Sequence, residues 1–271
     1  MIFVKHQVER EVKLKRSVEQ TLNPLADLAA NSVSLLAKPF GSFESGGREY
    51  SLPRYLFVGP RGGDDPIRVG IFAGLHGDQP EATHAVVAFL KILEANPELA
   101  RDYFLFVYPI CNPTGFEDGT RCSRRGRDLN REFWNATVEP EVTLLQSEIW
   151  SHALDGIISL HTDESSSGLY GFTRGLTFRK HLLEPALAAA EPVLPRNEEG
   201  VIDGFVAQRG VIRESYAGAI SGPPKVRPRP FEIALCGPGS APTFRLEQGF
   251  VLAMQTTLAR YRELIAYGAH L

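Results

Sequence analysis

The sequence lacks several features that would mark particular classes of protein. No apolar run approaches the roughly 20 residues that a membrane-spanning helix requires. The charged segment 9–16 leaves no room for the apolar core of a signal peptide. The three cysteines, Cys111, Cys122 and Cys236, have the spacing of neither a disulfide framework nor a metal motif. With a formal net charge of −3, the composition gives no support for nucleic-acid binding. We therefore expect a protein of the reducing cytoplasm that binds neither membrane nor nucleic acid.

The composition that is present suits one large globular domain. Hydrophobic residues make up 43% of the 271 residues, enough for a sizeable core. Strand-like and helix-like segments alternate, which predicts a three-layer α/β domain with a mixed, mostly parallel sheet between helices. We expect an N-terminal helical segment over residues 1–37, packed on a single α/β domain over residues 38–271.

The expected elements follow from the spacing of apolar residues. Strands are expected over residues 55–58, 68–75, 103–109, 155–160 and 231–236, after a hairpin entry over 39–56. Helices are expected over residues 81–95, 139–153, 178–190 and 248–267, after one or two N-terminal helices over 8–38 that Pro24 interrupts. Because they are rich in polar residues, Gly or Pro, three long segments predict loops or irregular chain, namely 111–137, 162–174 and 195–227.

Two histidines stand where open α/β sheets carry their chemistry. His76 follows the expected strand over 68–75, just before Pro80 opens a helix, and His161 ends another apolar strand. The carboxyl ends of neighbouring parallel strands meet at one edge of a sheet. Neutral imidazoles bind zinc well, and a catalytic zinc takes about three protein ligands. The pair predicts a shared metal site; the alternative is two structural histidines that cap backbone carbonyls.

A cluster of arginines marks the expected loop over residues 111–137. Five of them fall within eleven positions, and these are Arg121, Arg124, Arg125, Arg127 and Arg131. Guanidinium groups stay charged and bind carboxylates through two parallel hydrogen bonds. The cluster therefore predicts a carboxylate-binding site, although a solvated basic loop would have the same composition.

Several short motifs occur in a fixed order along the chain. They are Gly74-Leu75-His76-Gly77-Asp78-Gln79-Pro80, the turn-like Asn112-Pro113-Thr114-Gly115, Gly119-Thr120-Arg121 with Asp128-Leu129-Asn130-Arg131, Ser159-Leu160-His161, and Phe231-Glu232-Ile233-Ala234-Leu235-Cys236-Gly237-Pro238. Together they resemble the zinc metallocarboxypeptidases of the carboxypeptidase A type, in the bacterial branch near succinylglutamate desuccinylase and aspartoacylase. The resemblance extends over residues 38–265 and implies the fold of that family.

The resemblance also implies roles for individual residues. His76 and His161 would be zinc ligands, and Arg121 would polarise the scissile carbonyl. Asn130 and Arg131 would bind the terminal carboxylate of the substrate. In the family, water activated by zinc attacks an amide carbonyl while a glutamate serves as general base and then as acid.

Two positions depart from the pattern of the family. Gln79 stands where the family has a zinc-binding Glu, and a neutral amide is a weaker zinc ligand than a carboxylate. Cys236 stands at the place of the catalytic Glu. Glu232 lies four residues earlier on the same face, a displacement of roughly 13 Å, so it supplies the base only if the alignment shifts. The other candidate bases are Asp163 and Glu164, and Cys236 could instead be a thiolate ligand beside the two histidines.

Two functions of different classes remain open on this sequence. The first is a zinc-dependent hydrolase of an amide bond next to a free carboxylate, acting on a small peptide or an N-acyl amino acid. The alternative is a catalytically inactive relative that binds a carboxylate or a peptide. The intact histidines and arginines favour the first function, whereas Gln79 and Cys236 favour the second. Metal content would discriminate between them.

Overall fold

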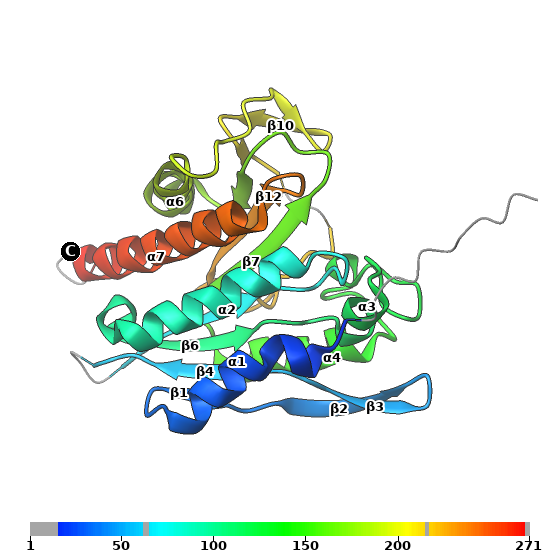
Figure 1. Ribbon diagram of the computed structural model, residues 1–271. Coiled ribbons are helices and arrows are strands. Elements are labelled where there is room, and N and C mark those ends of the chain that lie inside the picture. The colour runs from blue at the N-terminus through cyan, green and yellow to red at the C-terminus, as the bar shows by residue number, and fades with distance from the viewer. Residues whose placement is uncertain (1–15, 62–64, 215–216, 269–271) are drawn as a thin grey trace, which may run out of the picture.

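One large sheet forms the centre of the computed structural model, which describes residues 16–61, 65–214 and 217–268 (Figure 1). Part of the predicted N-terminal helical segment, residues 1–15, lies outside this range, and the division of the chain at residue 38 stays a prediction. In spatial order, the ten strands of the described sheet are β1 (Leu35–Ala37), β4 (Tyr55–Val58), β6 (Tyr103–Tyr108), β5 (Ile67–Phe72), β7 (Gly156–Asp163), β12 (Phe231–Pro238), β8 (Tyr170–Thr173), β11 (Val211–Ile212), β10 (Phe205–Gln208) and β9 (Val201–Ile202).

The centre of this sheet is parallel and its borders are mixed. Strands β6, β5, β7 and β12 run parallel to one another, while β4 and β8 join them antiparallel. A separate hairpin of β2 (Phe40–Ser45) and β3 (Arg48–Leu52) confirms the predicted hairpin entry. The carboxyl ends of β5, β7 and β12 therefore meet at one edge of the sheet, as the motif positions require.

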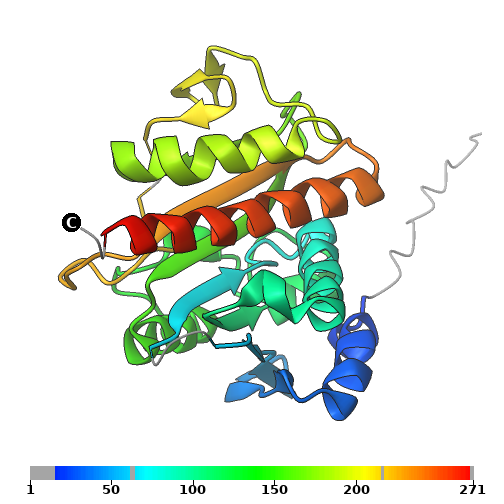
Figure 2. The same ribbon diagram turned by 90° about the vertical axis from the view of Figure 1, so that its left-hand side faces the viewer.

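Helices cover both faces of the sheet. On one face lie α1 (Val18–Asn31), α2 (Pro80–Ala95), α6 (Glu184–Ala190) and α7 (Thr243–Gly268), with α6 and α7 side by side in both Figure 1 and Figure 2. The opposite face is covered by α4 (Pro140–His152). The short elements are α3 (Pro113–Asp118), α5 (Leu176–Phe178), a π-helical turn over Arg179–Leu183, and 3-10 turns over Pro97–Ala100 and Leu129–Arg131. This arrangement confirms the three-layer α/β fold.

The two apolar layers explain why the central strands are near-continuous runs of hydrophobic residues. Along β5, Val69 and Ile71 pack into the core beneath α2 and α7, whereas Phe72 packs into the core beneath α4. Successive side chains of a strand point to opposite faces, so a strand covered on both sides needs an apolar residue at every position.

The structure corrects three expectations about local elements. The segments over 162–174 and 195–227 are not wholly irregular, because they contain β8 to β11, the upper part of Figure 1. Asn112-Pro113-Thr114-Gly115 is not an isolated turn: the Asn112 side chain accepts from the Gly115 N–H and caps α3. Pro24 lies inside α1 without interrupting it, and the burial of Leu22 and Leu25 on either side offsets the hydrogen bond that proline cannot make.

Candidate functional site

A cavity of about 430 Å³ is lined by residues of β7, β12 and β8 and of the loops around them. It is lined by every residue that the sequence predicts for the site, namely His76, Gln79, Arg121, Asn130, Arg131, His161, Glu232 and Cys236. The structure therefore brings these residues together from four separate parts of the chain. Their individual roles stay predictions.

His76 is held between two side chains at this cavity. Its Nε2 lies 3.0 Å from Asp128 Oδ1, and its Nδ1 lies 3.2 Å from Gln79 Oε1. Burial raises the pKa of Asp128, but the hydrogen bond with His76 and two nearby arginines outweigh burial and hold this pKa well below its usual range. The carboxylate is therefore an acceptor. The hydrogen between His76 and Asp128 therefore lies on Nε2, and Nδ1 is the nitrogen that faces Gln79.

Gln79 is fixed in one orientation by the backbone of β7. Its Nε2 donates to the Thr162 carbonyl oxygen over 2.6 Å, and its Oε1 accepts from the Thr162 N–H over 3.1 Å. These two bonds identify the amide oxygen as the atom that faces His76 Nδ1. The amide oxygen is an acceptor, and so is Nδ1 of an uncharged His76 ring, so a proton or a cation between the two atoms makes this contact favourable.

His161 presents the third acceptor. The rings of His161 and His76 are 5.3 Å apart, and His161 Nε2 lies 3.2 Å from Ser159 Oγ. Its Nδ1 is buried and has no hydrogen-bond partner in the described part of the chain. Burial lowers the pKa of His161 to about 3, and the neighbouring His76 and Arg121 act in the same direction. The ring is therefore neutral, which is the form that binds metals.

These three acceptors fit a metal ion, and the Gln79 amide is the weak ligand among them. Two ligands of a tetrahedral zinc at about 2.0–2.1 Å lie about 3.3 Å apart, close to the 3.2 Å between His76 Nδ1 and Gln79 Oε1. Among residues 16–61, 65–214 and 217–268, no three His, Cys, Asp or Glu side chains are grouped to hold a metal. Both suggested third ligands, the Gln79 amide and the Cys236 thiolate, stay predictions.

The loop that carries His76 is shaped by a close approach of backbones. A Cβ atom at Gly77 would lie 2.0 Å from the Gly115 carbonyl carbon at the start of α3, so no larger residue fits there. Arg16, just before α1, donates to the Gly77 carbonyl oxygen over 2.8 Å. The loop between β5 and α2 is thereby pressed onto α3, and His76 is held beside Asp128.

Only two of the five clustered arginines line the cavity. Arg121 lies 3.3 Å from Asp128, and Arg131 follows Asn130, whose Oδ1 accepts from the Ile220 N–H over 3.1 Å. Burial of Asn130 and its bond to Ile220 fix this side of the cavity. The two arginines and the amide are suited to hold a carboxylate.

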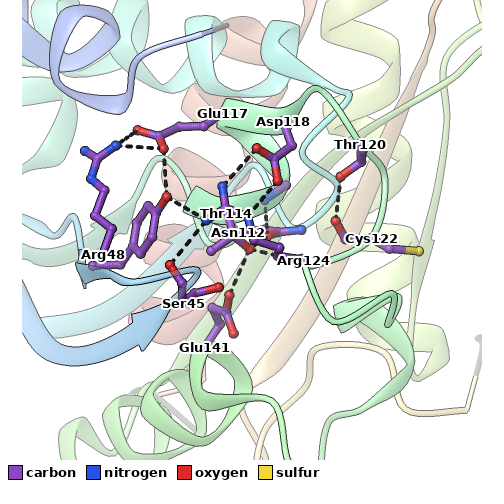
Figure 3. A network of polar contacts seen from close by, with 12 residues as sticks. Ser45, Arg48, Asn112, Thr114, Glu117, Asp118, Thr120, Cys122, Arg124 and Glu141 are labelled. Carbon is purple, nitrogen blue, oxygen red and sulfur yellow. Dashed lines mark hydrogen bonds and ion pairs between the residues drawn. The ribbon is translucent and has the colours of Figure 1, made fainter.

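The other three arginines have structural contacts. Arg124 binds Asp118 with two hydrogen bonds of 2.8 and 2.9 Å and donates to Tyr50, which joins α3 to the β2–β3 hairpin (Figure 3). Arg125 donates to the Val138 carbonyl, and Arg127 lies 3.7 Å from Glu132. Of the five arginines, only Arg121 and Arg131 thus remain candidates for binding a carboxylate.

The buried carboxyl group of Glu141, which contacts Thr114, allows the effect of burial on stability to be tested. Glu141 is 2% exposed and accepts from Thr114 Oγ1 over 3.3 Å (Figure 3). Burial raises the pKa of Glu141, and the charge of Glu139 adds to this. The folded state therefore binds the proton more tightly than the unfolded state. The resulting stability is complete below the unfolded pKa of about 4.3 and is lost as the pH rises through the folded pKa.

We expect Glu141→Gln to increase the free energy of unfolding at neutral pH, because glutamine keeps the acceptor and carries no charge. The increase should shrink as the pH falls toward the unfolded pKa. Urea unfolding at a series of pH values measures it, with the exposed Glu198→Gln as control. An effect of Glu141→Gln that does not change with pH would contradict the expectation.

Cys236 and Glu232 line the cavity at different positions along β12. Cys236 pairs in register with His161 on β7 and with Tyr170 on β8. Burial raises the pKa of the Cys236 thiol to about 12, so the thiol keeps its proton at neutral pH. Glu232 pairs instead with Ile157, four residues away along β12.

Sequence reasoning missed several residues of the cavity wall. They share a position on strands that were expected to be loops, or in the turns between them, and are Tyr170, Phe172, Arg174, Asp203 and Ile212. Strands of two to four residues are too short for a period of two to be recognised. The alternation of the aromatic residues Tyr170 and Phe172 was the one local signal.

The fold is that of a carboxypeptidase-like α/β domain. Residues 66–195 match the family model of the succinylglutamate desuccinylase/aspartoacylase catalytic domain. The comparison with curated proteins gave no match. The match to the family model and the names of the structural neighbours confirm the resemblance predicted from the motifs.

Solved structures with the same fold include three bacterial proteins. A protein from Shewanella denitrificans, described as a candidate metallopeptidase, has 24% identity and a TM-score of 0.73, with 89% of each chain covered. A metallo-carboxypeptidase from Burkholderia cenocepacia has 16% identity and a TM-score of 0.72 over 92% of this chain and 70% of the other. A metallo-carboxypeptidase from Pseudomonas aeruginosa, in complex with (2-guanidinoethylmercapto)succinic acid, has 17% identity and a TM-score of 0.68 over 92% and 70%. At these identities the similarity shows the fold.

None of the described helices has the length and apolar character needed to cross a membrane.

Proposed function

We propose that the protein is a zinc-dependent hydrolase of an amide bond next to a free carboxylate, with a small peptide or an N-acyl amino acid as substrate. One observation carries the proposal: acceptors of His76, Gln79 and His161 lie in the same cavity as Arg121 and Arg131. A metal and a carboxylate could therefore be bound side by side. The match to a hydrolase family model supports the same class.

In this proposal some residues of the cavity would bind the metal and others would bind the substrate. His76, Gln79 and His161 would hold the zinc, with Asp128 fixing the ring of His76. When bound, zinc would act as a Lewis acid on the scissile carbonyl and activate water. Arg121 would hold the negative charge that develops on the carbonyl oxygen.

The carboxylate of the substrate would be bound by other residues of the same cavity. Arg131 would supply the charge, and Asn130, fixed by Ile220, would supply an amide N–H. Holding the carboxylate there places the neighbouring amide bond within the cavity rather than in bulk solvent, which is the contribution of orientation to catalysis.

The proton acceptor is the weakest part of this site. Cys236 stands beside His161, where the base was predicted, and its thiol is protonated at neutral pH. Asp163 lines the cavity, but its carboxylate already accepts from Tyr170 and Ser165. This observation favours a second candidate function, an inactive relative that binds the carboxylate of a peptide or N-acyl amino acid. A cytoplasmic location is proposed for either function.

Zinc binding and turnover together test the proposal. We expect the purified protein to bind zinc, and we expect His161→Ala to weaken binding at least about tenfold, whereas the exposed His181→Ala should leave it unchanged. Isothermal titration with zinc measures both.

Hydrolysis of N-acetyl amino acids and dipeptides by the zinc-loaded protein then separates the two functions. Measurable turnover that His161→Ala abolishes would support the hydrolase. Zinc and ligand binding without turnover would support the binding protein. Failure to bind either zinc or a carboxylate-bearing ligand would refute both functions.

A further inference from the structure

The loop that joins β5 to α2 carries two of the three proposed metal ligands, His76 and Gln79. Gly77 lies between them, and a side chain at this position would collide with the backbone of α3. Glycine resists rotation of its backbone less than any other residue, because it has no Cβ atom. The direction in which the two ligands point therefore depends on what holds the peptide units on either side of Gly77.

Both of these peptide units are held by hydrogen bonds from outside the loop. The Gly77 N–H donates to the Arg121 carbonyl oxygen over 3.4 Å, and the Gly77 carbonyl oxygen accepts from Arg16 Nη1 over 2.8 Å. The second bond is the shorter one, and its donor is charged. Because hydrogen bonds from charged donors are stronger than those between neutral groups, Arg16 makes the larger contribution to the orientation of the loop.

The Arg16 side chain is itself fixed by its surroundings. It is half-buried, and its guanidinium carbon lies 5.7 Å from the centre of the Phe116 ring on α3, next to the start of α1 (Figure 1). Phe116 is buried, so the guanidinium group packs against a rigid surface. A planar guanidinium can lie against a ring and donate hydrogen bonds from its edge at the same time.

The backbone of Arg16 is anchored by the first turn of α1. Ser17 caps this helix: its side chain accepts from the Gln20 N–H over 3.2 Å, and its carbonyl oxygen accepts from the Thr21 N–H over 3.1 Å. A continuous series of contacts thus leads from α1 through Arg16 to the loop that carries the two ligands.

A metal ion is bound only by conformations of this loop in which both ligands face the same point. If the Gly77 carbonyl loses its charged donor, the loop spends a smaller fraction of the time in such a conformation. The apparent affinity for the metal falls by the same factor, although no ligand has changed. Thermodynamic linkage requires the reverse effect as well, so a bound metal strengthens the contact of Arg16 by that factor.

We propose that Arg16 is a positioning residue for the metal site. Through the Gly77 carbonyl it keeps His76 and Gln79 in the arrangement that binds zinc, and it thereby couples the start of α1 to the affinity for zinc. Arg16 precedes Gly77 by 61 residues and lies outside the cavity wall, so it acts without touching metal or substrate. The inference rests on the proposed function, because it concerns the zinc that this function requires.

Isothermal titration of two variants with zinc tests this proposal. Arg16→Gln should weaken zinc binding by about tenfold, the lower end of the usual loss when a residue that holds a metal ligand is changed. Arg16→Lys keeps the charge and a hydrogen-bond donor, so it should bind zinc more tightly than Arg16→Gln. Repulsion between the charge at position 16 and the metal would produce the reverse order, because Arg16→Gln removes that repulsion.

The matched control is an arginine that makes the same kind of contact elsewhere. Arg262 is also half-buried, and its Nη1 donates to the Arg101 carbonyl oxygen over 3.0 Å. Arg262→Gln therefore removes a comparable bond and should leave the affinity for zinc unchanged.

Hydrogen exchange at the start of α1 separates this coupling from a purely structural role. Amides at a helix end exchange by local opening, so a general stabilisation of the fold by zinc does not by itself slow them. We expect zinc to slow the exchange of the Gln20 and Thr21 amides in the natural protein and to leave it unchanged in Arg16→Gln. The amide of Tyr267, near the end of α7, is the control and should not respond to zinc.

The outcomes separate this inference from the proposed function. Equal or tighter zinc binding by Arg16→Gln, beside a natural protein that binds zinc, would overturn the inference and leave the proposed function standing. Absence of zinc binding by the natural protein would overturn the inference together with the zinc-dependent hydrolase. If Arg16→Gln does not fold, the natural protein decides: exchange at Gln20 and Thr21 that does not respond to zinc overturns the inference.

Discussion

Replacing Gln79 and Cys236 together by glutamate is expected to raise the rate of amide hydrolysis with zinc by about 10²–10⁴, the usual contribution of general acid–base catalysis. Cys236 is the position on β12 that pairs with His161, and its protonated thiol cannot take a proton from water at neutral pH. A carboxylate there would supply the missing acceptor. The assay is turnover of N-acetyl amino acids and dipeptides at saturating zinc.

The change at Gln79 is needed because of what its amide does now. Gln79 donates to the Thr162 carbonyl, a bond that a glutamate cannot make. Gln79→Glu alone should therefore destabilise the metal-free protein and bind zinc at least about tenfold more tightly, since it adds one negative charge beside the metal. Thermal unfolding without zinc measures the loss of stability, and thermal unfolding with zinc measures the gain in zinc binding. The stabilisation by zinc should be larger in Gln79→Glu than in the natural protein.

Controls keep the double variant interpretable. Gln79→Glu with Cys236→Gln has a side chain of similar size at position 236 but no base, and it should not show this increase in rate. Should the unaltered protein already turn over such substrates at about 1–10³ per second, the idea that these two positions impair it would be wrong. Asp163 or Glu164 would then be the residues to test as the base.

Arg131→Ala is expected to weaken binding of a carboxylate-bearing ligand by about 2–5 kcal/mol, the usual loss when one partner of a desolvated charge pair is removed. This corresponds to about 30-fold to several thousand-fold in Kd. Binding of the corresponding amide should change far less, because the amide carries no charge for the guanidinium to hold. Titration of an N-acetyl amino acid and of its amide measures both.

The matched control comes from the same loop. Arg127 is exposed and lies 3.7 Å from Glu132, outside the cavity wall, so Arg127→Ala should leave both affinities unchanged. Equal affinity of the natural protein for acid and amide would refute a carboxylate site at Arg131, whatever the variant does.

The sequence by itself determined the central part of the fold and the place of the site. Strands such as β5 and β7 are covered on both faces, so they appear as apolar runs that any reader of the chain can locate. His76 and His161 follow two of these runs, and a parallel sheet brings their carboxyl ends together. Motif order then supplied Arg121, Asn130 and Arg131, which all line the cavity.

The tertiary structure decided which of several equivalent residues could act. Five arginines look alike in the sequence, but Arg124 is held by Asp118 and only Arg121 and Arg131 line the cavity. Arg174 directly follows β8, a strand of four residues that is too short to be recognised by its periodicity and whose partners on β12 lie 60 or more residues further along the chain.

The environment of Gln79 likewise depended on a contact between distant residues. Gln79 is a departure from a motif in the sequence, whereas in the folded chain its amide is oriented by Thr162, 83 residues away. Glu232 and Cys236 differ by four positions, and only their register with β7 shows that Cys236 is beside His161 and Glu232 beside Ile157. Local periodicity records which face of a strand is buried; it does not record which partner a side chain meets there, because that partner comes from elsewhere in the chain.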